Sequence, residues 1–360
     1  MQLNRILHHL RFGPLAMLAL AAAAPAASPV PDGTVTIAGV KVPVSNLLSP
    51  EGAAYLGHLI VDKPFGSPVA DIKAERARQD EIMLGFLKPM RERYRVDVTE
   101  ERIGGIVTDV VTPAEGIAPE NRDRVLINLH GGGFTTGART ASLVESVPLA
   151  ALMRIKVISI DYRMAPESRF PAASEDVAAV WRALLKRYSP SHMALYGCSA
   201  GGMLTAESIA WFHAHDLPDP AAIGIFCATL GPLAAGDSVH LAGPLLGLTM
   251  PPPSVAATAG KAPPPRGYLD GIKTDDPRAY PLYDPALLAK FPPTLFISGT
   301  RSFEFSAALN SHNQLAKAGV DTRFFGWDGM FHGFFYNSEL PESREAYAVM
   351  VRFFEDHLAK

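Results

Sequence analysis

The sequence is poor in cysteine: its 360 residues include two, Cys198 and Cys227. Two cysteines cannot form the disulfide network on which many small secreted domains depend for stability. Cys198 also lies inside a glycine-containing turn, where a disulfide to Cys227 would distort the backbone. We therefore expect two buried free thiols in a protein stabilised by its hydrophobic core.

A strong charge of one sign is also absent. The 33 lysines and arginines nearly balance the 36 aspartates and glutamates, which gives a formal net charge of −3 at pH 7. Proteins that bind the phosphate backbone of nucleic acids usually carry a dense patch of positive charge. We therefore expect no nucleic-acid partner.

The apolar segment near the N-terminus is short. Residues 12–24 form a run of about 13 mostly apolar residues, fewer than a transmembrane helix requires. Arg5 and Arg11 supply a basic region before it, and small residues around Ala26 resemble a cleavage site. This pattern predicts a signal peptide at residues 1–26, cleavage near Ala26, and a periplasmic or secreted protein without a stable membrane anchor. A homodimer is an expectation that the sequence leaves open.

Short apolar runs alternate with segments of helical periodicity, which is typical of an α/β protein with a mostly parallel sheet. Hydrophobic residues make up 48% of the chain, enough for one large core. We expect strands at residues 94–98, 106–112, 124–129, 156–161, 192–196, 223–228, 294–298 and 322–327. We expect helices at residues 74–94, 174–188, 200–215, 306–317 and 342–358, with Ser174 and Ser306 as N-caps.

Two regions outside this pattern predict a cap over the active site. Residues 27–93 form an N-terminal cap region, in which residues 29–73 are expected to be loop and 74–94 an amphipathic helix. The catalytic domain then covers residues 94–360, with a proline-rich cap insertion at about 233–285. Apolar side chains in this insertion are expected to line the substrate pocket: Leu241, Leu245, Leu246 and Leu248.

The sequence Gly197-Cys198-Ser199-Ala200-Gly201 fits the Gly-x-Ser-x-Gly nucleophile elbow. Its flanking glycines allow a strand to turn sharply into a helix, because a β-carbon there would collide with neighbouring backbone. An apolar strand precedes the motif and a proline-free helix follows it, so we expect Ser199 to be a nucleophile. The alternatives are a small-residue turn without chemistry and a nucleophilic Cys198, although the elbow exposes its central residue.

A second glycine motif, His130-Gly131-Gly132-Gly133, follows the strand at 124–129. Acyl transfer passes through a tetrahedral intermediate whose oxyanion is stabilised by backbone amides, and glycine lets these amides approach closely. We expect the amides of Gly131, Gly132 and Ala200 to form this oxyanion hole. A phosphate-binding loop is the alternative, but the Lys-Ser that would follow such a loop is missing.

His332 lies on a loop after the late strand 322–327 and is flanked by glycines. A histidine that follows the serine in the chain and occupies such a loop is where this architecture places its general base. We therefore expect His332 to be the base.

These motifs, together with Asp161-Tyr162-Arg163-Met164-Ala165-Pro166-Glu167, resemble those of the bacterial hormone-sensitive-lipase-like (family IV) carboxylesterases of the α/β-hydrolase fold. The resemblance runs from about residue 94 to the C-terminus. It implies an eight-stranded, mostly parallel sheet flanked by helices, with a cap formed by the N-terminal region and an insertion. It also implies hydrolysis of carboxylic esters with short to medium acyl chains, with no metal and no organic cofactor.

The sequence departs from this family at two positions. The family usually has aspartate where this chain has Cys198, and it places the aspartate of the triad where this chain has Ser302. Serine cannot carry the negative charge that orients the histidine and stabilises the imidazolium. We expect Glu304, two residues further along the same loop, to take this role; Asp328 and a serine–histidine dyad without an acid are the alternatives.

The sequence therefore predicts a serine hydrolase that cleaves small-molecule esters through an acyl-enzyme. A lactone hydrolase and a lipase of the same fold are alternatives, because both also attack acyl carbonyls. A non-catalytic, ligand-binding homologue is an alternative of a different class, although the presence of both Ser199 and His332 argues against it.

Overall fold

The computed structural model describes residues 35, 39–64, 68–247 and 267–359. The chain divides into two compact units, residues 1–43 and 44–360, and all the described helices and strands belong to the second. The predicted signal peptide at residues 1–26 and Leu248 lie outside the described residues.

The second unit contains a single sheet of eight strands among the described residues, arranged in the order β1-β2-β4-β3-β5-β6-β7-β8. β2 is antiparallel to both β1 and β4, and the other neighbours are parallel. The predicted fold class is therefore confirmed. The strand bounds are β1 Val96–Ile103, β2 Ile106–Pro113, β3 Val125–Leu129, β4 Lys156–Ile160, β5 Met193–Cys198, β6 Ala222–Phe226, β7 Thr294–Gly299 and β8 Thr322–Trp327.

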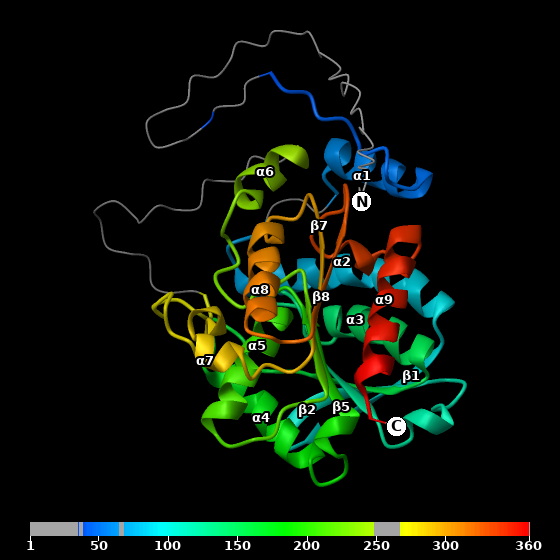
Figure 1. Ribbon diagram of the computed structural model, residues 1–360. Helices are drawn as coiled ribbons and strands as arrows, with labels where there is room; N and C mark the ends of the chain where they lie inside the picture. The colour runs from blue at the N-terminus through cyan, green and yellow to red at the C-terminus, as the bar shows by residue number, and fades with distance from the viewer. Residues whose placement is uncertain (1–34, 36–38, 65–67, 248–266, 360) are drawn as a thin grey trace, which may run out of the picture. The chain divides into compact units, whose positions relative to one another are not determined.

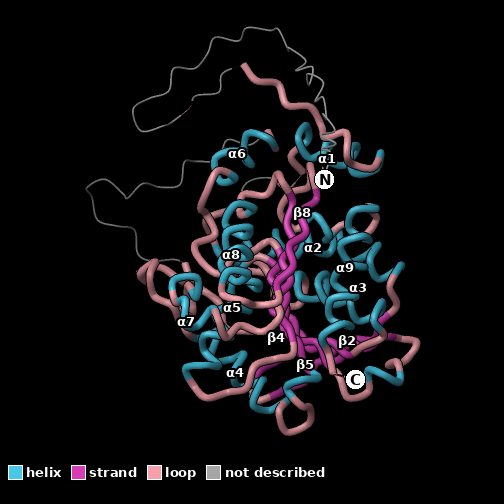
Figure 2. The backbone as a smooth tube through the Cα atoms, viewed as in Figure 1, coloured by secondary structure: helices cyan, strands magenta, loops and turns pink. Residues whose placement is uncertain are grey.

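Helices cover both faces of this sheet (Figures 1 and 2). Helices α4 (Ala172–Leu184), α5 (Ala200–Ala214) and α8 (Phe305–Lys317) pack on one face, and α3 (Ala141–Met153) and α9 (Pro341–His357) pack on the other. Strand β5 is buried throughout because its side chains alternate between the two cores. Leu195 joins the core beneath α4 and α5, whereas Tyr196 joins the core beneath α3 and α9.

The register of the parallel strands brings the chemistry to one edge of the sheet. Leu129, at the end of β3, is paired with Gly197 on β5, and Cys198 is paired with Phe226 at the end of β6. The loops that follow these strands therefore emerge side by side. Ligands of open α/β sheets bind at this carboxyl edge, so the fold places the glycine motif beside the nucleophile elbow.

The prediction that residues 29–73 are loop is wrong for α1, Pro50–Asp62. The Ser49 side chain accepts a hydrogen bond from the Gly52 amide, and Pro50 and Glu51 suit the first turn of a helix. Ser49 also donates to the Glu342 carboxylate at the start of α9 through its amide and its hydroxyl. The helix predicted at residues 74–94 is confirmed as α2, Ile72–Arg93.

Three further details differ from the sequence predictions. Helix α3 was not predicted, because its mostly apolar composition and internal Pro148 hide the helical period. Ser174 lies inside α4, which begins at Ala172 after Pro171, so it is not an N-cap. Ser306 likewise lies inside α8, where Glu304 occupies the N-cap position.

The insertion between β6 and β7 is described in part. It contains α6 (Ser238–Leu245) and, after the undescribed residues, the short helix α7 (Pro285–Leu288). Helix α6 contacts α8 and the loop before it. The Ser238 hydroxyl donates to the Phe303 carbonyl of that loop at 2.8 Å, and the Arg301 guanidinium of the loop donates to the Leu245 carbonyl at 2.8 Å.

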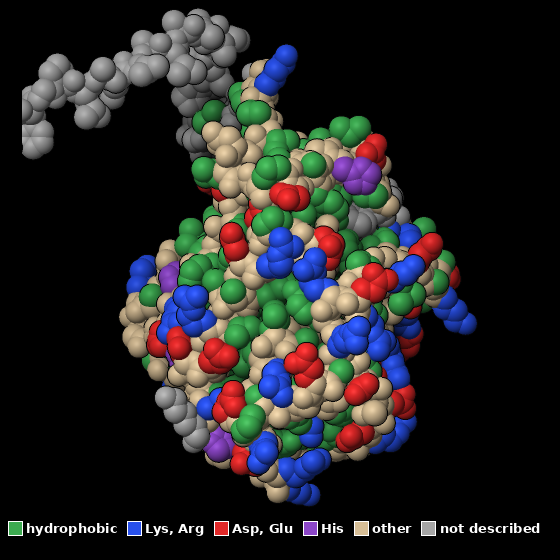
Figure 3. All heavy atoms as spheres, turned by 90° about the vertical axis from the view of Figure 1, so that its right-hand side faces the viewer, with side chains coloured by type: hydrophobic (Ala, Val, Ile, Leu, Met, Phe, Trp, Pro, Cys, Tyr) green, Lys and Arg blue, Asp and Glu red, His purple; other side chains and the backbone are tan. Residues whose placement is uncertain are grey.

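The surface agrees with the small net charge. On the face in Figure 3, lysine and arginine side chains are interspersed with aspartate and glutamate. Within the described ranges, every helix is too short or too polar to cross a membrane.

Candidate active site

Ser199 lies at the turn between β5 and α5, with φ 57° and ψ −121°. This conformation is unfavourable for a residue with a side chain and persists only where the surroundings enforce it. A β-carbon on Gly197 would come within 2.2 Å of the Leu129 carbonyl oxygen, and one on Gly201 within 1.7 Å of the same atom. The two glycines thus allow β3 to pass tightly beneath the elbow, which presents Ser199 to a cavity.

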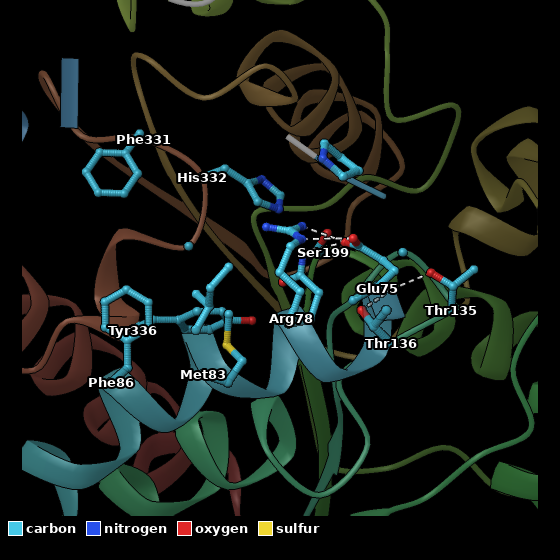
Figure 4. Close-up of a pocket in the computed structure, with 16 residues that line it drawn as sticks. Glu75, Arg78, Met83, Phe86, Thr135, Thr136, Ser199, Phe331, His332 and Tyr336 are labelled. Atoms are coloured by element: carbon cyan, nitrogen blue, oxygen red, sulfur yellow. Dashed lines mark hydrogen bonds and ion pairs between the residues drawn. The ribbon is translucent and has the colours of Figure 1, made fainter. Parts of the chain in front are cut away.

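His332 and Glu304 are joined by a hydrogen bond of 2.8 Å between Nδ1 of the ring and Oε2 of the carboxylate. They are 28 residues apart, on the loops that follow β8 and β7. The ring of Phe303 stacks on the imidazole at 4.7 Å between centroids. The second ring nitrogen of His332 is therefore the one left for a substrate or a serine, and Figure 4 shows the ring turned towards the part of the cavity where Ser199 lies.

The Glu304 carboxylate is fully buried and accepts two further hydrogen bonds. The Ser298 hydroxyl donates to Oε1 at 2.9 Å, and the Ser302 hydroxyl donates to Oε2. Burial by itself raises the pKa of Glu304, but the attraction of His332 and the hydrogen bonds from His332 and Ser302 outweigh it and lower the pKa below its usual value. Glu304 is therefore ionised at neutral pH. Ser302, at the position of the family's aspartate, supports this carboxylate.

Asp328, the alternative acid, is oriented elsewhere. Its carboxylate accepts hydrogen bonds from Ser45 and, at 3.2 Å, from the Thr300 hydroxyl, and it is exposed. The contacts of the described residues thus favour Glu304 over Asp328 as the partner of His332.

The glycine motif forms a tight loop after β3. Gly132 has φ 114°, and a β-carbon there would lie 2.2 Å from the Thr136 carbonyl oxygen, so the position requires glycine. Gly132 and Gly133 line the cavity. The predicted contribution of Gly131 to the oxyanion hole is wrong, because its amide donates to the buried Glu145 carboxylate at 2.8 Å. Ala200 begins α5 directly after Ser199.

The cavity that contains Ser199 and His332 has a volume of about 630 Å³. Helix α2 forms one wall, with an apolar part near Phe331 and Tyr336 and a polar part near Thr135 and Thr136 (Figure 4). In the polar part, Arg78 extends from α2 and pairs with Glu75 at 2.6 Å. The side chains contributed by α2 are Glu75, Arg78, Gln79, Ile82, Met83 and Phe86.

The structure does not bring the predicted pocket leucines to this cavity. Leu241 is 46% exposed, Leu245 and Leu246 are half-buried, and none of the three is among the residues that line the described cavity. Contacts between α6 and α8 hold this segment instead. The apolar wall of the cavity comes instead from α2, where Ile82, Met83 and Phe86 belong to the apolar stripe seen in the sequence.

The two cysteines are free and buried, as predicted. Burial raises the pKa of both thiols, so they stay protonated at neutral pH. A buried thiol is a poor nucleophile, which argues against Cys198 as the attacking group. Cys227 lies near Glu304 and His332, and their ligand atoms fall within 4.8 Å of one another. A protonated thiol beside a histidine and a carboxylate already paired with each other does not fit a metal ligand set.

Sequence reasoning missed three contributors to the site. Arg78 and Glu75 lie on α2 outside its apolar stripe, so only the position of the helix reveals them. Glu145 is a single acid in the otherwise apolar and uncharged α3, and such isolation was the available signal.

The sequence of this chain is similar to those of known esterases. Residues 126–336 match a protein family described by the alpha/beta hydrolase fold. The chain is 31% identical over 281 residues to an acetyl-hydrolase of Streptomyces hygroscopicus, a match that covers 75% of this chain and 90% of that protein. It is 27% identical over 243 residues to an esterase of Acinetobacter venetianus, covering 66% of this chain and 76% of that protein.

Solved structures of esterases are also similar to this chain. The structure of esterase E25 is similar with a TM-score of 0.74 and 26% identity, covering 91% of this chain and 99% of that one. An esterase from the bacterial hormone-sensitive lipase family has a TM-score of 0.72 and 26% identity, covering 86% of this chain and 99% of that one.

Proposed function

Because this chain belongs to the α/β-hydrolase family and is a carboxylic ester hydrolase of the hormone-sensitive-lipase-like group, we propose that Ser199, His332 and Glu304 form its catalytic triad. The observation that carries the proposal is the convergence of Ser199, on its strained elbow, and His332, held by Glu304, on one cavity.

In the proposed reaction, the Ser199 hydroxyl attacks the ester carbonyl while His332 takes its proton. The tetrahedral intermediate collapses, the alcohol leaves with that proton, and an acyl-enzyme remains. Water then attacks the acyl-enzyme by the same route and releases the acid. The ionised Glu304 orients the imidazole and stabilises the imidazolium that forms in both steps.

The amides of Gly132, Gly133 and Ala200 are the proposed oxyanion donors. Gly132 and Gly133 line the cavity, and Ala200 opens the helix whose N-terminus lies behind the nucleophile. Among the hydrogen bonds of the described residues, none uses the amide of Gly132 or Gly133. Amides without an internal acceptor are suited to receive the negative oxygen of the intermediate.

A serine-directed phosphonate tests the nucleophile. It should label Ser199, and Ser199→Ala should abolish both the labelling and the hydrolysis of p-nitrophenyl acetate. Labelling at another residue, or full turnover by the variant, would show that the assignment is wrong.

We propose esters of short to medium acyl chain as substrates. A cavity of about 630 Å³ with an apolar wall at Ile82, Met83 and Phe86 suits an acyl group of limited length, and the Arg78–Glu75 pair makes its other part polar. A panel of p-nitrophenyl esters of rising chain length, measured beside lactones and emulsified triglycerides, separates a carboxylesterase from a lactone hydrolase and a lipase.

We also propose export, on the basis of the basic and apolar segments of residues 1–26. Mass spectrometry of the protein from the periplasm or medium of the expressing cells should give a mature N-terminus near Ala27. A homodimer stays a prediction, for which light scattering after size-exclusion chromatography is the measurement.

A further inference from the structure

Glu145 on α3 is a buried carboxylate close to the proposed site, and the catalytic steps above do not use it. It accepts four hydrogen bonds. Its Oε1 receives the Gly131 amide at 2.8 Å and the Tyr336 hydroxyl at 2.6 Å. Its Oε2 receives the Asn128 side-chain amide at 2.9 Å and the Cys198 backbone amide at 3.2 Å.

Three of these four donors belong to the segments that carry the proposed reaction. Gly131 precedes the two glycines that line the cavity, Cys198 precedes Ser199, and Tyr336 follows His332 by four residues and lines the cavity itself. One carboxylate therefore connects the oxyanion loop, the nucleophile elbow and the histidine loop, which come from three different parts of the chain.

The four donors require two acceptor oxygens at this position, which a carboxyl group offers in either protonation state. The Tyr336 hydroxyl and the Asn128 amide can reorient and become acceptors, but the backbone amides of Gly131 and Cys198 cannot. These two amides bind different oxygens of Glu145. A glutamine has one acceptor oxygen, so in either orientation its NH₂ group would face one of the two backbone amides.

We propose that Glu145 is a positioning residue that holds the oxyanion loop, the elbow and the histidine loop in their reactive arrangement. Its carboxylate accepts a hydrogen bond from the amide of Cys198. This is the position where the family that the chain resembles usually has an aspartate. This inference rests on the proposed function, because it assigns Glu145 a role in the same reaction.

The test compares wild type with Glu145→Gln on p-nitrophenyl acetate. We expect kcat to fall about 10- to 100-fold, because a displaced oxyanion donor or nucleophile costs that much, while KM changes by less than about threefold. A trifluoromethyl ketone that forms a tetrahedral adduct on serine should bind more weakly by about the same factor as the loss in kcat/KM. A role in folding alone would lower the amount of active enzyme and leave its affinity for this analogue unchanged.

Glu207→Gln is the matched control. Glu207 on α5 is also a buried carboxylate, and both of its oxygens lack a hydrogen-bond partner among the described residues. We expect its kcat and its analogue affinity to stay close to wild type. An equal loss in both variants would overturn the proposal, as would a Glu145→Gln enzyme with kcat within about twofold of wild type.

If Glu145→Gln does not fold, Tyr336→Phe removes one of the four hydrogen bonds and keeps the carboxylate. We expect a several-fold loss in kcat and a matching loss in analogue affinity with KM nearly constant; an unchanged kcat contradicts the proposal. The same series tests the proposed function separately. If wild type hydrolyses the ester and Ser199→Ala does not, the proposed function is supported, whatever the result for Glu145→Gln.

Discussion

Glu304 contacts His332 from the loop after β7, two residues beyond the position where the family usually has the aspartate of its triad. Helix α8 begins directly after Glu304, and this backbone turn directs the longer side chain inward to Nδ1 of His332. Ser302 occupies the earlier position and donates to the same carboxylate oxygen. The charge has thus moved along the loop while its contact with the imidazole is kept.

Glu304→Gln should lower kcat by up to about 10⁴-fold, because the amide cannot hold the reactive tautomer or offset the imidazolium charge. Steady-state kinetics on p-nitrophenyl acetate measures this loss. Asp328→Asn is the control: its carboxylate contacts Ser45 and Thr300, so its activity should stay close to wild type. The reverse order of losses would assign the acid to Asp328.

Adding Ser302→Asp to Glu304→Gln should restore part of the lost turnover. The Ser302 hydroxyl lies 3.4 Å from Nδ1 of His332, so an aspartate there places a carboxylate within reach of the ring. The same kinetic assay measures the recovery. A double variant as slow as Glu304→Gln alone would mean that the loop no longer accepts an acid at residue 302.

At the scale of elements, α2 should set the acyl preference. Met83→Ala removes apolar surface from the cavity wall, and each methylene of substrate buried there is worth about 0.8 kcal/mol, or roughly fourfold in kcat/KM. We expect the preferred chain in the p-nitrophenyl series to lengthen by a few carbons. Leu245→Ala is the control, because Leu245 is not among the residues lining the described cavity, and it should change all substrates equally.

The start of α1 should contribute measurably to stability. Ser49→Ala removes the side-chain cap and one hydrogen bond to Glu342, so we expect a loss of about 1 kcal/mol in the free energy of unfolding. Urea denaturation measures it. Ser189→Ala is a matched Ser-Pro control, since Ser189 precedes Pro190 but makes no side-chain cap bond, and it should be nearly neutral. Equal losses would rule out a capping effect.

The sequence was sufficient to predict the elements whose pattern lies within one short segment of the chain. Continuous apolar runs located the strands, and the glycines around Ser199 located the elbow, because both follow from the geometry of one segment. Helix α1 was hidden by its glycines and by the prolines around it, and Gly52 packs against the Glu342 side chain far along the chain. The hydrogen bond of the Gly131 amide was hidden for the same reason, since its acceptor, Glu145, lies on another helix.

The pocket leucines show the limit of reasoning from composition. An apolar cluster in an irregular insertion indicates burial, but it does not identify the surface that buries it. Here α6 of the insertion packs on α8, and one wall of the cavity comes from α2, much earlier in the chain. Contacts between distant segments decide which apolar stripe meets the substrate, and no single segment encodes them.

For the whole molecule, Glu145 should make stability depend on pH. Burial raises its pKa from 4.5 to about 7, against the opposing effect of its hydrogen bonds. The titratable groups that interact with it are Tyr162, Tyr196, Cys198, Tyr336 and Tyr347. Burial raises the pKa of each of them as well, so none of them is a cation that would stabilise the carboxylate. The folded protein therefore binds a proton at Glu145 that the unfolded chain has already released between these two pH values.

Since the folded state holds the extra proton, the free energy of unfolding should fall as pH rises from about 4.5 to about 7. The contribution of this one group is about 3 kcal/mol at most, at about 1.4 kcal/mol for each pH unit. Other groups also titrate in this range, so the informative quantity is the difference between wild type and Glu145→Gln in urea denaturation at a series of pH values. The free energy of unfolding of wild type relative to Glu145→Gln should fall as pH rises through this window and become constant above it. Two parallel curves would mean that Glu145 has the same pKa in the folded and unfolded chain.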